Sequence, residues 1–563
     1  KTNQVLYIFR EKNNNKVYHR EDDTFVYYRA PEGVPTKKLM PFEQLEQVSV
    51  KYKDKGQISH DSAYESDVKI STKHAMDYYF HSQGECKRVK GNILFCDIEV
   101  DTGKERVFPN QKEAKFPINM ISTIFNGEKT LYVIDNKTEP IQQIEGVKFK
   151  IFTSERRLMD EFIKDFKRND PDFICGWNLI NFDMDYIFNR LDKIGIAHSA
   201  FSNFGEFYVD GTKYICHIPG TVVLDQEFLY KSFTFTKMEN YKLGYISHHE
   251  LGVTKIQLPL PFNEMYWKML NKTIEYNIRD SELLEKLDEK LAHINLLNEL
   301  RIICNTSFEG TSSFGQIDSM MVSYLKNKGL ASKSSDPHIT KEQYPGAYVF
   351  EPNPNVYEWI TDFDFASLYP SLMITYNIGI NSFVMKTEDP HLGYKLTYCP
   401  DKLQEKFAII IDPLFEKKRV EVTREQLFAK IKENNLVYTI NGCFFLPHEK
   451  EFSVFGEVVD MLMKSRGEYK VKMFQAIEKN DKDLDTFYYI RQLVYKVLAN
   501  TLYGVVANKA FRFFDTSLAS AITLAGQEAL KTSIIEADAF MRSIDTGKTY
   551  ISPKQLTKEE MFV

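Results

Sequence analysis

The 563-residue sequence has no apolar run that approaches the roughly 18 residues needed to cross a membrane. Its seven cysteines form no Cys-x-x-Cys pair, which argues against a zinc ribbon and against a disulfide framework. The N-terminus, Lys-Thr-Asn-Gln, has neither a signal-peptide pattern nor an initiator methionine. These absences lead us to expect a protein of a reduced, intracellular compartment.

The sequence also lacks the positive net charge that would mark a nucleic-acid binder, since its formal charge is -6. That balance does not exclude a nucleic-acid binder, because acids at metal sites and bases along a groove can cancel in the sum.

Aromatic residues make up 14% of the chain. Most of these rings must belong to the core, although some would suit base stacking. A chain of this length is expected to form several domains.

Two acidic residues interrupt a nearly continuous apolar run at Ile93–Val100. Such a run is typical of a central, buried strand. Asp97 and Glu99 are two residues apart, so both side chains leave the same face of that strand. Two acids in a buried strand are difficult to explain without a divalent cation, which prefers oxygen ligands.

Two further acidic segments follow. The stretch Pro171–Asp183 carries Asn178 and Asp183 at a predicted strand-to-helix junction, and Tyr276 lies one helical turn before Asp280. Taken singly, each pattern occurs by chance in many helices.

A second acidic pair begins the most informative block, Thr361–Ile380. Asp362 and Asp364 lie between apolar neighbours, which predicts a strand with both carboxylates on one face. A buried face would require a compensating cation, and the alternative is an edge strand with solvated aspartates. The following Ser-Leu-Tyr-Pro-Ser is expected to turn the chain, because proline cannot continue a central strand.

A hairpin and a pair of helices are predicted further along. Alternation on both sides of Asn441-Gly442 indicates a β-hairpin. Residues 453–508 read as two helices around a polar turn, with Asp515 as the cap of a third helix over Leu518–Met541. Helical spacing puts each of two polar sets on one face, where they form either an anion site or a solvated basic face: Arg466 and Lys470, then Lys496, Asn500 and Tyr503.

The acidic segments before residue 300, taken in order, resemble the three-part signature of DEDD 3′→5′ exonucleases, in the arrangement that family B (alpha-like) DNA polymerases carry. The resemblance implies that Tyr276 orients the attacking water and that four acids bind metal: Asp97, Glu99, Asp183 and Asp280. Asp185 comes two residues too late for the spacing of the motif and is interpreted as a structural or solvated acid.

The later motifs resemble the palm and fingers of the same family, most like the polymerases of T-even-type bacteriophages. Asp-Phe-Ala-Ser-Leu-Tyr-Pro-Ser resembles the first palm motif, and Lys496–Gly504 resembles the fingers motif with Thr501 in place of serine. The resemblance implies metal binding by Asp364 and the carbonyl of Phe365, and nucleotide binding by Phe365, Ser367, Leu368, Tyr369, Arg466, Lys470, Lys496, Asn500 and Tyr503. DNA contacts are implied for Tyr344, Gly346 and Gly504, of which the first two resemble the family's Tyr-x-Gly element.

The family's third palm motif, Asp-Thr-Asp-Ser, does not occur in the sequence. Asp545-Thr-Gly-Lys is the nearest match and lacks the second acid, and Met561–Val563 reads as the start of an interrupted strand. We therefore expect either a truncated sequence or a split polymerase whose partner chain supplies this motif and the thumb.

The expected fold is a multidomain α/β protein with a β-rich N-terminal domain, a ribonuclease H-like exonuclease domain, a partial palm and helical-hairpin fingers. The expected domains are residues 1–91 with 293–335 returning to them, 92–292 for the exonuclease, 336–452 and 509–563 for the palm, and 453–508 for the fingers.

The resemblance implies template-directed DNA synthesis with proofreading, two Mg²⁺ ions at each site, and a cytoplasmic location in a phage-infected cell. The implied partners are primer-template DNA, deoxynucleoside triphosphates, a second polypeptide and a sliding clamp, with no membrane. The alternatives are a stand-alone 3′→5′ exonuclease with a vestigial palm and a non-catalytic DNA-binding subunit. The exonuclease acids argue against the second, and the fingers cations argue against the first.

Overall fold

A computed structural model describes most of the chain. The described residues are 4–10, 16–22, 24–34, 36–51, 58, 62–70, 72–74, 76, 91–205, 207–210, 215–234, 236–257, 259–306, 308, 313–335, 343–358, 360–414 and 416–546. The chain forms two compact units. The first comprises residues 1–5, 20–86 and 298–563, and the second comprises residues 6–19 and 87–297. The boundaries of the second unit lie close to the expected exonuclease domain.

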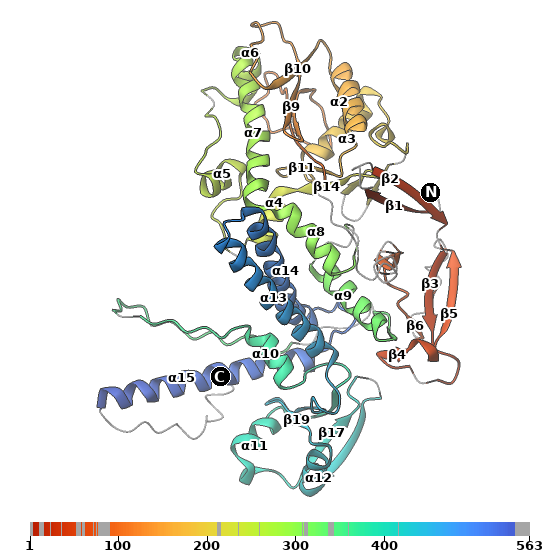
Figure 1. Ribbon diagram of the computed structural model, residues 1–563, viewed down its shortest axis with the longest axis vertical. Helices are drawn as coiled ribbons and strands as arrows, with labels where there is room; N and C mark the ends of the chain where they lie inside the picture. The colour runs from red at the N-terminus through yellow and green to blue at the C-terminus, as the bar shows by residue number, and fades with distance from the viewer. Residues whose placement is uncertain are drawn as a thin grey trace. The chain divides into compact units, whose positions relative to one another are not determined.

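The second unit contains a six-stranded mixed sheet in the order β10-β9-β8-β7-β11-β14 (Figure 1). Strands β7, β8 and β9 are antiparallel, whereas β11 is parallel to β7 and to β14, and β10 is parallel to β9. The strand expected at Ile93–Val100 is confirmed, and it lies inside the sheet. The strand bounds are β7 Ile93–Val100, β8 Ile118–Phe125, β9 Glu128–Ile134, β10 Val147–Phe152, β11 Phe173–Gly176 and β14 Val222–Asp225.

Helices cover both faces of this sheet. Leu158 and Phe162 of α2 pack with Cys96 and Ile98 of β7 on one face. On the other face, Ile274 of α7 packs with residues of β8 and β9. The bounds are α2 Glu155–Asn169, η3 His198–Phe201, α3 Asp183–Ile194, α4 Gln226–Phe233, α5 Leu243–Leu251, α6 Phe262–Lys268 and α7 Leu270–Leu291, with a small sheet of β12 Tyr208–Asp210 and β13 Ile215–His217.

The N-terminal part is built from short strands. Strand β1 pairs with β2, and β15 pairs with β4. The bounds are β1 Gln4–Arg10, β2 Lys16–Asp22, β3 Thr24–Arg29, β4 Leu39–Pro41, η1 Phe42–Gln44, β5 Glu46–Lys51, β6 Ala63–Tyr64, α8 His293–Ile303, α9 Ser313–Asn327 and β15 Leu330–Ser332.

A buried ion network joins distant segments of the first unit. The guanidinium of Arg512 lies 2.6 Å from an Asp318 oxygen and 3.2 Å from an Asp67 oxygen, and its side chain is 2% exposed. A buried charge of this kind requires partners. The loop that carries Arg512 is thus bound both to α9 and to the turn that follows β6.

An antiparallel five-stranded sheet follows, in the order β18-β17-β16-β20-β19. The hairpin predicted at Asn441-Gly442 is confirmed, because β19 pairs with β20 across this turn and Gly442 has a φ of 73°. The bounds are β16 Phe383–Thr387, α11 Leu392–Tyr398, η5 Pro400–Lys402, β17 Lys406–Ile411, β18 Lys418–Thr423, α12 Arg424–Asn434, β19 Val437–Tyr438 and β20 Cys443–Phe445.

Two long helices, α13 (Val454–Glu478) and α14 (Lys482–Val506), form the predicted helical hairpin (Figure 1). Each has a side-chain cap at its N-terminus, from Ser453 and Asp481 respectively. Asp515 caps α15 (Thr516–Thr546) through the backbone amides of residues 517 and 518, as predicted, although the helix extends beyond the expected bounds.

No helix in the described part of the chain is both long and apolar enough to span a membrane.

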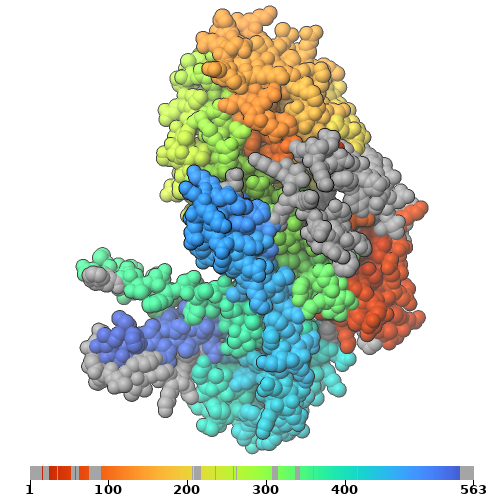
Figure 2. All heavy atoms as spheres, viewed as in Figure 1, coloured from red at the N-terminus to blue at the C-terminus, as the bar shows by residue number. Residues whose placement is uncertain are grey.

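The strand predicted around Asp362 and Asp364 is wrong. Residues 360–366 have no regular secondary structure and precede α10 (Leu368–Thr375), with both aspartates exposed. Figure 2 shows the segment before α10 extending from the body of its unit. A strand needs a neighbour for its backbone hydrogen bonds, and no described segment pairs with this one. The alternation of side chains was therefore insufficient to make a strand.

Candidate active sites

The first candidate site lies on the face of β7 that α7 covers. Alternate residues of β7, including Cys96 and Ile98, pack into the core beneath the sheet. Because side chains alternate along a strand, Asp97 and Glu99 must leave the opposite face. The sequence of this strand thus serves two purposes, a core on one side and a pair of carboxylates on the other.

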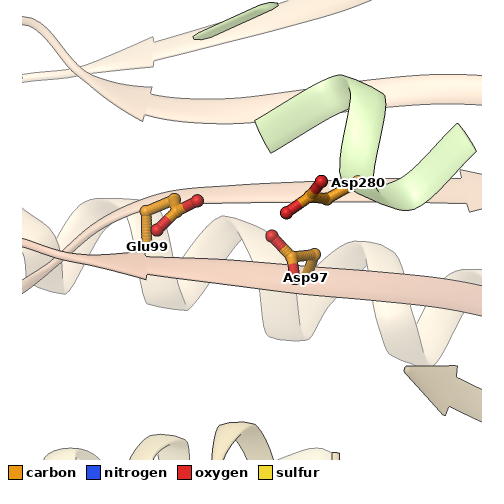
Figure 3. A group of neighbouring side chains, drawn as sticks. All are labelled: Asp97, Glu99 and Asp280. Atoms are coloured by element: carbon orange, nitrogen blue, oxygen red, sulfur yellow. The ribbon is translucent and has the colours of Figure 1, made fainter. Parts of the chain in front are cut away.

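A third carboxylate joins this pair from a distant part of the chain. Asp280 lies on α7, and ligand atoms of Asp97, Glu99 and Asp280 all lie within 4.8 Å of one another. Figure 3 shows the carboxylates of Asp97 and Asp280 pointing toward each other across the gap between strand and helix. Among the described residues this is the one group of three or more side chains placed to hold a metal ion.

The fourth predicted acid, Asp183, is the first residue of α3 and is buried. Its carboxylate accepts a hydrogen bond from the backbone amide of Ile98, the residue between Asp97 and Glu99. The strand-to-helix junction expected from the sequence is present, since β11 ends at Gly176 before α3 begins. Asp183 is thus adjacent to the acidic group but is not one of its three members.

Burial and mutual repulsion raise the pKa values of these acids. Burial, together with the charge of Asp280, raises the pKa of Asp97 to about 7. Burial, together with the charge of Asp97, also raises the pKa values of Glu99 and Asp183 well above their ordinary range. Several buried carboxylates at this spacing are unfavourable unless a positive charge compensates them.

One such charge comes from Lys255, which the sequence reasoning missed. Its ammonium lies 2.5 Å from Oδ2 of Asp280 and donates to the hydroxyl of Tyr276 at 3.1 Å. Burial alone would lower the pKa of Lys255, but the charges of Asp280, Tyr276 and Asp97 and the hydrogen bond to Asp280 together outweigh burial and raise it. Lys255 therefore remains protonated and connects the two residues of α7 that the sequence placed one turn apart.

The acidic group is suited to a divalent cation. It offers only carboxylate oxygens, which are the ligands that Mg²⁺ and other hard cations prefer. In addition, Oδ1 of Asp280 is buried and accepts no hydrogen bond within the described part of the chain. A buried carboxylate oxygen without a donor is costly unless something cationic binds it.

The second candidate site lies around the first turn of α10. Asp364 and Phe365 are exposed in the irregular segment before it. Ser367, the residue that precedes the helix, has a φ of 55°, and Leu368 begins the helix. Among the described residues, Asp364 is therefore not part of a group of three acidic side chains that could hold a metal ion.

Tyr369 is held between two neighbours at this site. Its ring stacks on that of Tyr503 from α14, with centroids 4.2 Å apart and planes at 22°. On another side it faces Gly526 of α15, where an added Cβ would lie 2.9 Å from Cε1 of the ring. A buried glycine in the middle of a helix is unfavourable by about 0.5–1 kcal/mol relative to alanine, and the ring of Tyr369 accounts for it here.

The residues that the sequence predicted for the fingers lie on the two helices of the hairpin. Tyr469 of α13 stacks on Tyr495 of α14 with centroids 5.6 Å apart. Lys470 and Lys496 are the residues that follow this stacked pair on the two helices. Nε of Arg466, one turn before Lys470, is buried and has no acceptor within the described part of the chain. A buried guanidinium nitrogen without an acceptor is suited to an anionic ligand, and Asn500 is exposed on α14.

Two of the three predicted DNA contacts line one open hollow of about 530 Å³, bounded by Tyr344, Gly504, Ala507, Asn508 and Lys509. The third, Gly346, lies in the same segment as Tyr344. Helix α15 holds that segment, since Thr523 donates to the carbonyl of Pro345 and Gln527 donates to the carbonyl of Gly346.

Two models of one protein family match the chain. The model described as DNA polymerase family B, exonuclease domain, matches residues 37–246, and the model described as DNA polymerase family B matches residues 302–559. The first range contains the acids of β7 and α3, and the second contains α10 and the helical hairpin. The chain belongs to the family B DNA polymerases with an exonuclease domain.

Curated relatives include polymerases of phages and of eukaryotes. The chain is 26% identical over 492 residues to the DNA-directed DNA polymerase of Enterobacteria phage T4, covering 78% of this chain and 54% of the relative. It is 25% identical over 536 residues to that of Escherichia phage RB69, covering 84% and 59%. It is 26% identical over 538 residues to the DNA polymerase delta catalytic subunit of Plasmodium falciparum, covering 84% and 45%. The chain thus spans little more than half the length of the phage relatives.

Proposed function

We propose that the chain carries out 3′→5′ exonucleolytic proofreading and forms the N-terminal portion of a DNA-directed DNA polymerase. The observation that carries this proposal is the group of Asp97, Glu99 and Asp280, of which Glu99 and Asp280 are buried, in a chain of this family. The mixed sheet with helices on both faces is consistent with a ribonuclease H-like exonuclease fold. The alternative functions are not favoured, because family models match both the exonuclease and the polymerase regions.

In the exonuclease site, Asp97, Glu99, Asp183 and Asp280 would hold two Mg²⁺ ions. When bound, such ions would lower the pKa of a water molecule and offset the negative charge of a phosphodiester. The hydroxyl of Tyr276, which accepts from Lys255, would orient that water. The ammonium of Lys255 adds a fixed positive charge beside the site, which favours a phosphate as charge develops on it.

In the palm, Asp364 and the carbonyl of Phe365 would be metal ligands, again for Mg²⁺. Tyr369, which lies between Tyr503 and Gly526, would exclude a ribose 2′-hydroxyl. Ser367 and Leu368 would contact the nucleotide at the start of α10.

The fingers would bind the triphosphate of an incoming nucleotide. Arg466, Lys470 and Lys496 supply the positive charge, with Asn500 beside them. Tyr344, Gly346 and Gly504 would contact the DNA backbone, while base pairing reads the template.

We further propose that polymerisation needs carboxylates from outside the described residues, on a second polypeptide or another segment that also supplies a thumb. The exposed and unpaired backbone before α10 supports this proposal, because such a segment can accept a strand. The strand expected at Met561–Val563 and the side chain of Asp545 lie outside the described residues. The further partner that this proposal implies is a sliding clamp. The location that it implies is the cytoplasm of an infected cell.

The exonuclease proposal is tested with the double variant Asp97→Ala/Glu99→Ala. We expect Mg²⁺-dependent removal of 3′ nucleotides from single-stranded DNA to fall by about a thousandfold or more, the scale on which catalysis depends on charge stabilisation. DNA binding, measured by fluorescence anisotropy, should be largely unchanged. A double variant that degrades single strands at the native rate would refute the assignment.

A further inference from the structure

A buried asparagine lies directly beside the acidic group. Asn277 is on α7, between Tyr276 and Asp280, and is fully buried. Its side-chain Nδ2 donates to Oδ2 of Asp97 at 2.7 Å, which links the helix to the strand that carries the acid. Asp97 and Asn277 are far apart in the sequence, so this bond exists only in the folded unit.

The turn of α7 that carries Asn277 is itself fixed against the sheet. The hydroxyl of Ser122 donates to the backbone carbonyl of Asn277 at 2.8 Å and lies 2.6 Å from the hydroxyl of Ser281. Ser122 is on β8, directly opposite Asp97 in the strand register. These three side chains are all buried. The backbone of Asn277 is therefore fixed relative to the strand pair on which Asp97 lies.

From this geometry we infer that Asn277 is a positioning residue for the divalent cation site, which it serves through Asp97. The inference rests on the proposed exonuclease function. The amide of Asn277 donates to one of the two carboxylate oxygens of Asp97, Oδ2. This hydrogen bond fixes the rotation of the carboxylate about its χ2 angle. Asn277 makes no hydrogen bond to the other oxygen, Oδ1.

An amide suits this position better than the other polar side chains of its size. Aspartate would replace the donor with a further negative charge among several buried carboxylates. Leucine or alanine would leave the carboxylate of Asp97 without this donor and free to rotate. Residues that hold a ligating carboxylate in this way typically change metal affinity or activity 10–100-fold when they are replaced.

The test compares metal binding by the full chain and three variants: Asn277→Ala, the reference Asp97→Ala/Glu99→Ala, and the matched control Asn271→Ala. Asn271 is also on α7, where it donates to the carbonyl of Pro140 at 3.0 Å and accepts from the amide of Gln142 at 2.8 Å. It is not a member of the acidic group. Mn²⁺ titration by calorimetry measures binding directly, and the double variant defines the binding that belongs to this site.

We expect Asn277→Ala to need about 10–100-fold more Mn²⁺ for half-saturation of that site, with a matching shift in the metal dependence of single-strand degradation. At saturating metal the degradation rate should recover to within about tenfold of the native rate. Asn271→Ala should titrate like the native chain. Should Asn277→Ala fail to fold, Asn277→Ser carries the same expectation, because its shorter side chain lacks the amide donor.

An unchanged titration for Asn277→Ala, or a shift equal to that of Asn271→Ala, would overturn the inference. A loss of rate that saturating metal does not restore would overturn it too, since it would assign Asn277 a role in the chemical step. These results differ from failure of the proposed function, in which the native chain itself would show no Mn²⁺ binding that depends on Asp97 and Glu99.

Discussion

The two candidate sites of this chain differ in how completely they are formed. In the second unit, carboxylates from β7 and α7 lie together, with Glu99 and Asp280 buried, and are contacted by Lys255 and Asn277. Before α10, Asp364 is exposed in a segment without regular structure. A site whose metal-binding side chains lie on packed helices and strands is organised before a metal ion or substrate binds, whereas a site on an unpaired segment is not. The comparison indicates that the first site is organised in the described chain and that the second is not.

The largest effect on the organised site, beyond removal of its acids, is expected from Lys255→Met. This change removes the ammonium beside Asp280 and Tyr276 but keeps most of the apolar stem. We expect the rate of single-strand degradation to fall about 100-fold, because a fixed charge at the reacting phosphate is lost. Lys268→Met is the control, since it removes an exposed ion pair with Glu264 instead. Equal rates for the two variants would show that Lys255 has no part in the site.

A second effect, on nucleotide selection, is expected at the site around α10, where it would sharpen the comparison. In a reconstituted polymerase, Tyr369→Ala should weaken discrimination against ribonucleotides by about 10–200-fold, the range of a lost steric contact of 1–3 kcal/mol. Gly526→Ala should have a smaller effect of the same kind, because its new methyl group displaces the ring of Tyr369. Single-nucleotide incorporation measures both. Discrimination that stays native in Tyr369→Ala would exclude this ring from the sugar pocket.

The smallest effect concerns stability without metal. Because the folded-state pKa of Asp97 lies near 7, above its unfolded value, the charged carboxylate destabilises the fold, fully above about pH 7 and progressively less as the pH falls. In EDTA, Asp97→Asn/Glu99→Gln should therefore be more stable than the native chain at pH 8, by on the order of 1 kcal/mol or more. The gain should diminish toward pH 4 in urea unfolding. A variant that is less stable at pH 8, or a gain independent of pH, would contradict the repulsion inferred here.

Local patterns in the sequence predicted those parts of the fold that depend on neighbouring residues. The apolar run around Asp97, the Asn441-Gly442 turn and the cap at Asp515 each appear where they were expected. The strand at Asp364 was wrong because a strand depends on a partner as much as on its own alternation. Lys255 and Asn277 could not be found in advance, because each matters through a contact with a residue elsewhere in the fold.

One signal could have pointed to them. Several acids converging in a buried site require compensation, which makes a lysine or an amide on the same surface a reasonable candidate. Asn277 lies within the motif itself, between Tyr276 and Asp280, whereas Lys255 lies in the irregular chain that follows α5. Only the folded structure selects it from the 72 lysines and arginines of the sequence.

The difference between the two sites is tested most directly by giving the purified chain both substrates. Single-stranded DNA with Mg²⁺ reports the exonuclease, and a primed template with Mg²⁺ and all four deoxynucleoside triphosphates reports the polymerase, with Asp97→Ala/Glu99→Ala as the control in each. We predict that the native chain shortens single strands, that the double variant does not, and that neither extends the primer. Robust extension by the chain alone, or no Asp97- and Glu99-dependent shortening, would contradict the account.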